Sequence, residues 1–288
     1  MPLLVPLPKR KPDSHKGDYG HVFVVGGSCG LSGAVCLCAK AALRIGAGLV
    51  TVGVPRSLNT IFEIKLTEEM SLPLADTKEQ SLSLKSFPAI REFAKKADVI
   101  ALGCGSSRHI STKKLLLKVI CEIDKTQVVD ADAINALAGN ITLLEKRITG
   151  NLILTPHLGE FSRLVKKDIS SIKKKRKELA KDFALRYNLI LVLKGNNTIV
   201  TNGKDCFHNI TGNSGMATAG CGDVLTGIIS GLIGQGIGCF DAAKLGVYVH
   251  GLAADYAVSI KSQFCLIASD IIEYLPKAVS KLKNRPPR

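Results

Sequence analysis

One glycine-rich stretch decides the fold: residues 213–227 read NSGMATAGCGDVLTG and lead straight into the apolar segment 228–233. Small residues at a helix start let the backbone approach a phosphate closely. Glycine permits tight turns, and the free N–H groups attract an anion. Asp223 breaks this pattern, because a carboxylate at the mouth of an anion site costs electrostatic energy. The stretch alone leaves two interpretations open, a general base beside a phosphate donor and a helix N-cap.

Length and composition predict an α/β enzyme. The chain has 288 residues, 46% of them hydrophobic, which is enough for a substantial core. Twenty-seven glycines, no Trp and 5% aromatic residues are more typical of a nucleotide-handling α/β fold than of a β-sandwich. Because neither an internal repeat nor a linker interrupts the chain, we expect a single domain over residues 1–288.

The nine cysteines predict neither a zinc site nor a disulfide framework, because none of them forms a C-x-x-C pair. They are interpreted as small core residues in a reducing cytosol. Cys36 and Cys38 could suggest a metal, but their apolar neighbours favour core packing.

The net charge of +15 raises the question of nucleic acid. The basic residues gather in segments 9–11, 166–167, 173–177 and 281–288, without interleaved aromatic residues that would stack on bases. Nucleic acid is therefore not expected as a partner. The excess charge could steer a polyanionic substrate such as a dinucleotide.

No membrane association is expected. The longest apolar segment, 34–54, is interrupted by Lys40 and Arg44 and falls short of a membrane span. At the N-terminus the apolar residues precede the basic ones, the reverse of a secretory signal. These features predict a cytoplasmic protein.

Apolar β-branched runs alternate with glycine turns and helical patterns, which predicts βα units. Four clusters of glycine or polar residues each follow a predicted strand, at 28–34, 103–105, 155–160 and 194–198. Ligand sites of α/β proteins form at the carboxyl ends of strands. The predicted strands are 21–25, 49–54, 98–102, 127–129, 151–154 and 189–193, with a hairpin of 199–201 and 206–208, and the predicted helices are 35–45, 87–96, 173–187, 241–260 and 267–282.

Several segments occur in the order and approximate spacing of one known family. Because of these segments, the sequence resembles the NAD(P)H-hydrate dehydratase family, which is a branch of the ribokinase-like superfamily. The resemblance covers nearly the whole chain and implies a mostly parallel central sheet with helices on both faces. The segments that carry it are His15 to Gly20, Gly33-Ala34, Asp130 to Asn135, Thr155-Pro156-His157, Lys194-Gly195 and Gly220 to Asp223.

The resemblance implies an ADP-dependent lyase that repairs hydrated NADH or NADPH. Such an enzyme phosphorylates the ring hydroxyl of the (S)-hydrate, eliminates phosphate, restores NAD(P)H and releases AMP. Asp223 would take the hydroxyl proton, while N–H groups of residues 219–222 stabilise the transferred charge. Mg²⁺ is expected as counter-cation, with Glu160 holding it through a water.

The same resemblance implies the binding residues. For Asp130 and Asp132, ligand orientation and strand-end capping stay open, and Asn213 is either a turn residue or a ligand contact. Asn135 is a secondary candidate. The hydrate site would comprise Ala34, Gly105, His157 and Asp223, and the nucleotide (ADP/AMP) site Lys194, Gly195, Asn196, Asn197, Thr198 and Gly222.

Four positions depart from the family pattern. Leu158 stands for Pro, Cys221 for Thr and Asn196 for Ala, and Cys104 lies where a Pro-containing turn is usual. None of these changes removes a titrating group, so they bear on donor affinity more than on activity.

Two alternative functions are also compatible with the glycine-rich stretch. One is a ribokinase-like kinase for a vitamin-precursor alcohol of the hydroxymethylpyrimidine or thiazole type, and the other is a nucleotide-sensing or nucleic-acid-binding module. An intact Asp223 argues against a pure binder. The resemblance further implies ADP in preference to ATP, a homo-oligomer, no epimerase domain in this chain and a separate NAD(P)H-hydrate epimerase as pathway partner.

Overall fold

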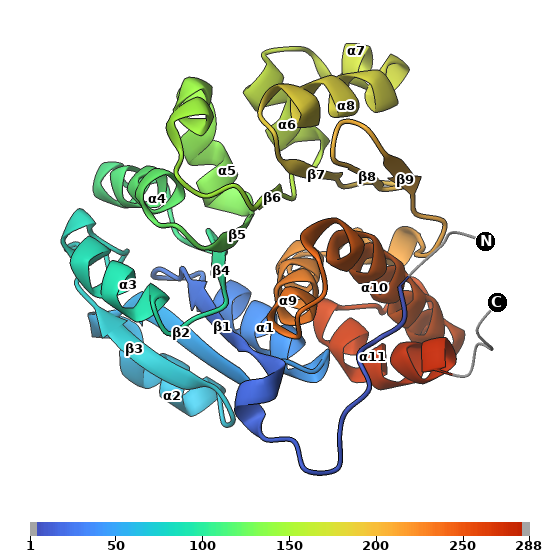
Figure 1. The fold of residues 1–288 in the computed structure, drawn as a ribbon, viewed down its shortest axis with the longest axis horizontal. Helices are drawn as coiled ribbons and strands as arrows, with labels where there is room; N and C mark the ends of the chain where they lie inside the picture. Colours follow the sequence, from blue (N-terminus) through green and yellow to red (C-terminus); the bar gives the residue numbers. More distant parts are fainter. Residues whose placement is uncertain (1–4, 284–288) are drawn as a thin grey trace.

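A computed structural model describes residues 5–283 and shows a nine-stranded sheet covered by helices on both faces (Figure 1). The strand order is β3-β2-β1-β4-β5-β6-β7-β8-β9; neighbours from β3 to β7 run parallel, and β8 and β9 add an antiparallel hairpin at one edge. The strands are β1 His21–Val25, β2 Leu49–Pro55, β3 Met70–Leu74, β4 Val99–Leu102, β5 Thr126–Val129, β6 Leu152–Leu154, β7 Ile190–Leu193, β8 Ile199–Thr201 and β9 Cys206–His208.

Side chains of the central strands alternate between two cores. In β1, Val22 and Val24 belong to one core, whereas Phe23 and Val25 belong to the other, and all four are fully buried. This follows from the two-residue period of a strand, and it explains why the strand is apolar at consecutive positions.

The helices divide between the same two cores. Short 3₁₀ turns link several of them: η1 Lys16–Tyr19, η2 Arg56–Leu58, η3 Leu84–Ser86, η4 Ile141–Lys146 and η5 Ser214–Met216. The core with Val22 is covered by α1 Ser32–Arg44, α2 Asn59–Lys65, α9 Cys221–Gly234, α10 Cys239–Lys261 and α11 Ala268–Lys283, and the core with Phe23 by α3 Phe87–Ala94, α4 Ile110–Glu122, α5 Ala131–Leu137, α6 Leu158–Val165, α7 Ile169–Lys174 and α8 Arg176–Arg186.

Helices α1 and α9 pack against each other through two glycines of α9. A Cβ on Gly227 would lie 2.1 Å from the carbonyl oxygen of Cys38, and one on Gly231 would lie 2.4 Å from the Ile45 side chain. Gly227, the last residue of the glycine-rich stretch, and Gly231 beyond it therefore have a packing role, because only glycine allows this close approach.

The sheet confirms the α/β prediction and each predicted strand, including the 199–208 hairpin. Strand β3 and helices α2, α4, α5, α6 and α7 were not among the predicted elements. None of the helices between residues 5 and 283 has both the length and the hydropathy of a membrane span. That a single domain spans residues 1–288 stays a prediction.

The prediction that the cysteines are small core residues is confirmed only in part. Cys36 and Cys38 are buried in the core under α1, as expected, and all nine cysteines are free thiols. Cys29 and Cys265 are exposed, so the core interpretation is wrong for these two.

Candidate active site

Asp223 is the third residue of α9 and not its N-cap. The N-cap is Gly220, whose φ of 90° lies in the left-handed region that favours glycine. Within residues 5–283, the N–H groups of Cys221, Gly222 and Asp223 have no protein acceptor. The N-cap interpretation of Asp223 is therefore wrong, and the helix start presents free donors suited to an anion.

A buried ion pair lies beside this helix start. The Lys194 Nζ donates to the Asp130 Oδ1 at 2.6 Å, and the Thr226 hydroxyl donates to the Asp130 Oδ2 at 2.9 Å. Burial acts to raise the pKa of Asp130, but the Lys194 ammonium and the hydrogen bonds outweigh it, so the pKa lies below its ordinary value. A Cβ on Gly222 would lie 3.1 Å from the Lys194 Nζ, so glycine keeps the helix start next to the ammonium.

Asp223 carries a perturbed carboxyl next to this pair. Burial first, and then the like charge of Asp130, raise the pKa of Asp223 to about 6, against smaller opposing effects of the Cys104 thiol and the Lys194 ammonium. Such a carboxyl changes protonation close to neutral pH, as a general base requires.

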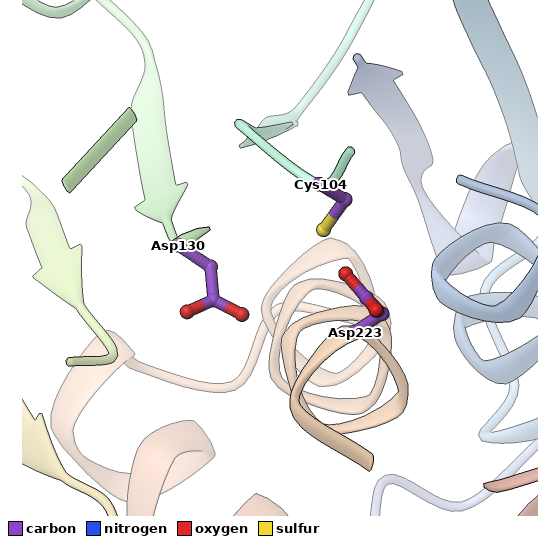
Figure 2. Close-up of side chains that lie close together, drawn as sticks. All are labelled: Cys104, Asp130 and Asp223. Carbon is purple, nitrogen blue, oxygen red and sulfur yellow. The ribbon is translucent and has the colours of Figure 1, made fainter. Parts of the chain in front are cut away.

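Cys104 completes a cluster with the two carboxylates. The Cys104 sulfur and the Asp130 and Asp223 carboxylate oxygens lie within 4.8 Å of one another, as Figure 2 shows for the three side chains. Cys104 is fully buried after β4, and its carbonyl accepts the Gly27 N–H at 3.0 Å. The sequence places Cys104 within the 103–105 strand-end cluster and as a departure from the family pattern, but it gives Cys104 no role of its own.

His157 and Glu160 form a capping box at the start of α6. The His157 Nδ1 accepts the Gly159 and Glu160 N–H groups at 3.0 and 3.2 Å, and the Glu160 Oε2 accepts the His157 N–H at 2.8 Å. Burial lowers the pKa of His157, and the positive charges of Lys194 and Arg163 lower it further. Burial also raises the pKa of Glu160 to about 7. His157 is thus held neutral, and its Nδ1 accepts the hydrogen bonds that cap α6.

Ala34 and Gly105, both predicted at the hydrate site, are neighbours. A Cβ on Gly105 would lie 3.1 Å from the Ala34 Cβ, and the Ser28 hydroxyl donates to the Gly105 carbonyl at 2.9 Å. The structure thus brings these two residues together beside Cys104.

The predicted nucleotide segment, 194–198, is a turn that follows β7. The Arg176 guanidinium donates to the carbonyl groups of Leu193 at 2.8 Å and Asn196 at 2.6 Å, and the Thr198 hydroxyl donates to the Gly195 carbonyl at 2.9 Å. Arg176 therefore fixes the shape of the segment from α8. Sequence reasoning missed it, because a basic residue within a run of lysines carries no local signal.

The sequence left the roles of Asp130, Asp132 and Asn213 open, and the structure shows the hydrogen bonds that each side chain makes. Asp130 is the N-cap residue of α5, but its side chain makes no capping hydrogen bond and accepts from Lys194 and Thr226 instead. The Asp132 Oδ2 accepts the Ser107 N–H at 2.9 Å. The Asn213 side chain accepts the Gly215 N–H and donates to Asp255, as a turn residue does.

The sequence profile of the NAD(P)H-hydrate dehydratase family matches residues 22–277. The chain belongs to this family. A bifunctional NAD(P)H-hydrate repair enzyme of Moorella thermoacetica is 43% identical over 280 residues, which cover 96% of this chain and 52% of the relative. This dehydratase-family chain thus spans about half the length of the bifunctional relatives it matches.

Two further relatives match the family chain over most of their own length. An ADP-dependent (S)-NAD(P)H-hydrate dehydratase of Neisseria meningitidis is 36% identical, over 96% of this chain and 89% of the relative. A crystal structure of an ADP/ATP-dependent NAD(P)H-hydrate dehydratase of Bacillus subtilis, co-crystallised with ATP/Mg²⁺, has a TM-score of 0.81 at 29% identity and covers 96% of this chain and 95% of that chain. The ribokinase of Thermotoga maritima, at a TM-score of 0.52 and 14% identity, shares the fold.

Proposed function

We propose that this chain is an ADP-dependent (S)-NAD(P)H-hydrate dehydratase. The observation that carries the proposal is the placement of Asp223. Its carboxyl, with a pKa of about 6, lies at a helix start whose N–H groups are free, next to the Lys194 ammonium. A phosphoryl transfer needs a base for the attacking hydroxyl and fixed donors for the transferred charge, and this site offers both.

The reaction is a phosphorylation followed by an elimination. Asp223 takes the proton of the ring hydroxyl while the hydroxyl oxygen forms a bond to the terminal phosphorus of ADP, and the bond from that phosphorus to AMP breaks. The ring nitrogen's lone pair then expels the new phosphate from the ring carbon. Loss of a proton from the neighbouring carbon restores NAD(P)H. The products are NAD(P)H, AMP and phosphate, and Asp223 must release its proton before the next turnover.

The two substrates would approach Asp223 from different loops. Ala34, Gly105 and His157 would line the hydrate site, on the loops after β1, β4 and β6. The nucleotide would bind along Lys194, Gly195, Asn196, Asn197, Thr198 and Gly222, where the Arg176 hydrogen bonds support the turn. Because the Asp130 carboxylate fixes its position, the Lys194 ammonium would meet the donor phosphate as a preoriented N–H donor.

The side chains present fit a magnesium ion near Glu160. Its carboxyl is buried and offers the oxygen chemistry that Mg²⁺ prefers, whereas the sulfur in the Cys104 cluster does not. We propose that Glu160 holds the ion through a water, as the nucleotide brings it in. When bound, Mg²⁺ would neutralise charge on the donor phosphates.

We further propose a cytoplasmic homo-oligomer that works with an NAD(P)H-hydrate epimerase. An enzyme selective for one epimer of the hydrate leaves the other epimer unrepaired, so an epimerising activity must supply the (S)-form. ADP is the proposed donor on the strength of the ADP-dependent Neisseria relative, whereas the Bacillus relative is ADP/ATP-dependent.

Product analysis tests the proposal. Purified protein with ADP and hydrated NADH should restore absorbance at 340 nm and release AMP and phosphate in equal amounts. A parallel series with ATP decides the donor. Phosphorylation of a hydroxymethylpyrimidine or hydroxyethylthiazole, without restored absorbance, would replace the proposal by the vitamin-precursor kinase.

A further inference from the structure

A hollow lies near Asp223, and of its lining residues only Asp132 and Asn135 were named above as open or secondary binding candidates. It has a volume of about 230 Å³ and is lined by residues of the loop after β4 and of helices α4, α5 and α6. Figure 1 shows α5 between α4 and α6. Its lining residues are Ser107, Arg108, Lys113, Asp132, Asn135, Ala136 and Arg163.

The lining is strongly cationic and its cations are not neutralised. Within residues 5–283, the Arg108 and Lys113 side chains form no ion pair and no hydrogen bond. Arg163 donates twice, at 3.1 and 2.9 Å, but to the neutral amide oxygen of Asn135. Three cations around one hollow without a carboxylate partner repel one another, so an anion bound there would be stabilised.

The one carboxylate of the lining is already engaged. Asp132 accepts the Ser107 N–H at 2.9 Å and the Asn135 amide at 3.4 Å. Ser107 has a φ of 77°, which is unusual for a residue other than glycine, and the Asp132 hydrogen bond holds it there. Asp132 thus shapes the loop that carries Arg108 and leaves a lining of net positive charge.

The hollow lies on the acceptor side of the base. Ser107 follows Gly105 by two residues, and Asp132 is close enough to Asp223 to contribute to its raised pKa. The nucleotide segment 194–198 follows β7 instead, two strands beyond β5 in the sheet. A ligand in the hollow would therefore be continuous with the hydrate site rather than with the donor segment.

Resting on the proposed function, we infer that this hollow binds a phosphate group of the dinucleotide substrate through Arg108, Lys113 and Arg163. Whole small-molecule ligands occupy pockets of roughly 300–1,000 Å³. The hollow is smaller, so it takes one phosphate-bearing part and not the whole dinucleotide. Two parts share this chemistry: the pyrophosphate, present in both hydrates, and the 2′-phosphate, present only in NADPH hydrate.

Charge-removing variants of similar length test the inference. Arg108→Gln and Lys113→Gln are assayed with NADH hydrate and NADPH hydrate, and Lys114→Gln, on the same helix but outside the lining, is the matched control. Each lost charged contact should raise KM for the hydrate roughly 10- to 100-fold. The values of kcat and of KM for ADP should stay near those of the wild type, and melting temperatures confirm that the variants are folded.

The two hydrates separate the two sources of phosphate. A rise in KM for both hydrates identifies the pyrophosphate, and a rise for NADPH hydrate alone identifies the 2′-phosphate. Unchanged KM values for both, or a rise confined to ADP, would overturn the inference while the proposed function stands. Absence of wild-type turnover with either hydrate would instead remove the proposed function, and the inference with it.

Discussion

The Lys194 ammonium lies 2.6 Å from the Asp130 carboxylate, and this contact joins the end of β7 to the end of β5. The Thr226 hydroxyl, which lies on α9, donates a hydrogen bond to the same carboxylate. Three segments far apart in sequence, which carry the donor segment, the start of α5 with Asp132, and the base Asp223, are thereby held in one arrangement. Activity and stability should both depend on this pair.

Removing the cation of this pair should destabilise the protein strongly. Lys194→Met leaves the Asp130 carboxylate buried and unpaired, which should lower the free energy of unfolding by about 3–5 kcal/mol. Urea denaturation measures the change. The double variant Lys194→Met with Asp130→Asn should recover part of the loss, since it removes the unpaired charge. A single variant as stable as the wild type would contradict this account of the pair.

Stability should fall as pH rises from about 4 to about 7 through two buried carboxyls. Burial raises the pKa of Asp223 to about 6 and that of Glu160 to about 7, above the ordinary values that both regain on unfolding. The folded state therefore binds more protons than the unfolded state in this interval. Each group should contribute a loss on the order of 1–3 kcal/mol.

Unfolding of the wild type and of Glu160→Gln across this pH range measures the effect. Glutamine keeps an oxygen for the His157 N–H but does not titrate. As pH rises, the wild type should therefore lose unfolding free energy relative to Glu160→Gln. A constant difference would show that Glu160 titrates at its ordinary pKa in the folded state.

The Cys104 thiol should lower the pH at which the general base Asp223 loses its proton. The thiol lowers the pKa of Asp223 by hydrogen bonding to the charged form. Cys104→Ala should therefore move the acid limb of the profile of kcat/KM against pH to higher pH, and Cys104→Ser, which restores a donor, should move it back. Coincident limbs for the wild type and the alanine variant would leave the thiol without this role.

Arg176 should act on nucleotide binding without contacting the base. Its guanidinium holds two carbonyl groups around the 194–198 turn, a geometry that lysine cannot reproduce. Arg176→Lys should raise KM for ADP about tenfold, with KM for the hydrate unchanged. Arg186→Lys, on the same helix and far more exposed, is the control. Equal KM values in the two variants would exclude the positioning role.

The fold could be predicted where burial leaves a local pattern. Strand β1 is apolar at every position from Val22 to Val25 because both of its faces are covered. Strand β3 lies at the sheet edge, contains Pro73 and is half exposed, so its sequence gives no such signal. Helix α4 was also not predicted, although its buried residues Leu115, Leu116 and Val119 recur at helical spacing.

The site could be predicted in its residues but not in its contacts. A glycine stretch and polar strand ends follow from local chemistry, which is why Asp223, His157 and Lys194 stand out in the sequence. The pairing of Lys194 with Asp130 spans 64 residues, and no local pattern encodes it. The pKa of Asp223 likewise depends on burial and on Asp130, which only the folded chain brings together.

The central claim is that Asp223 is the general base of a hydrate dehydratase. The direct measurement is the rate at which absorbance at 340 nm returns when Asp223→Asn and wild-type protein act on hydrated NADH with saturating ADP. The variant should have a kcat lower by roughly 10²- to 10⁴-fold, while calorimetry shows ADP binding within a few-fold of the wild type. Turnover by Asp223→Asn at the wild-type rate would contradict the claim.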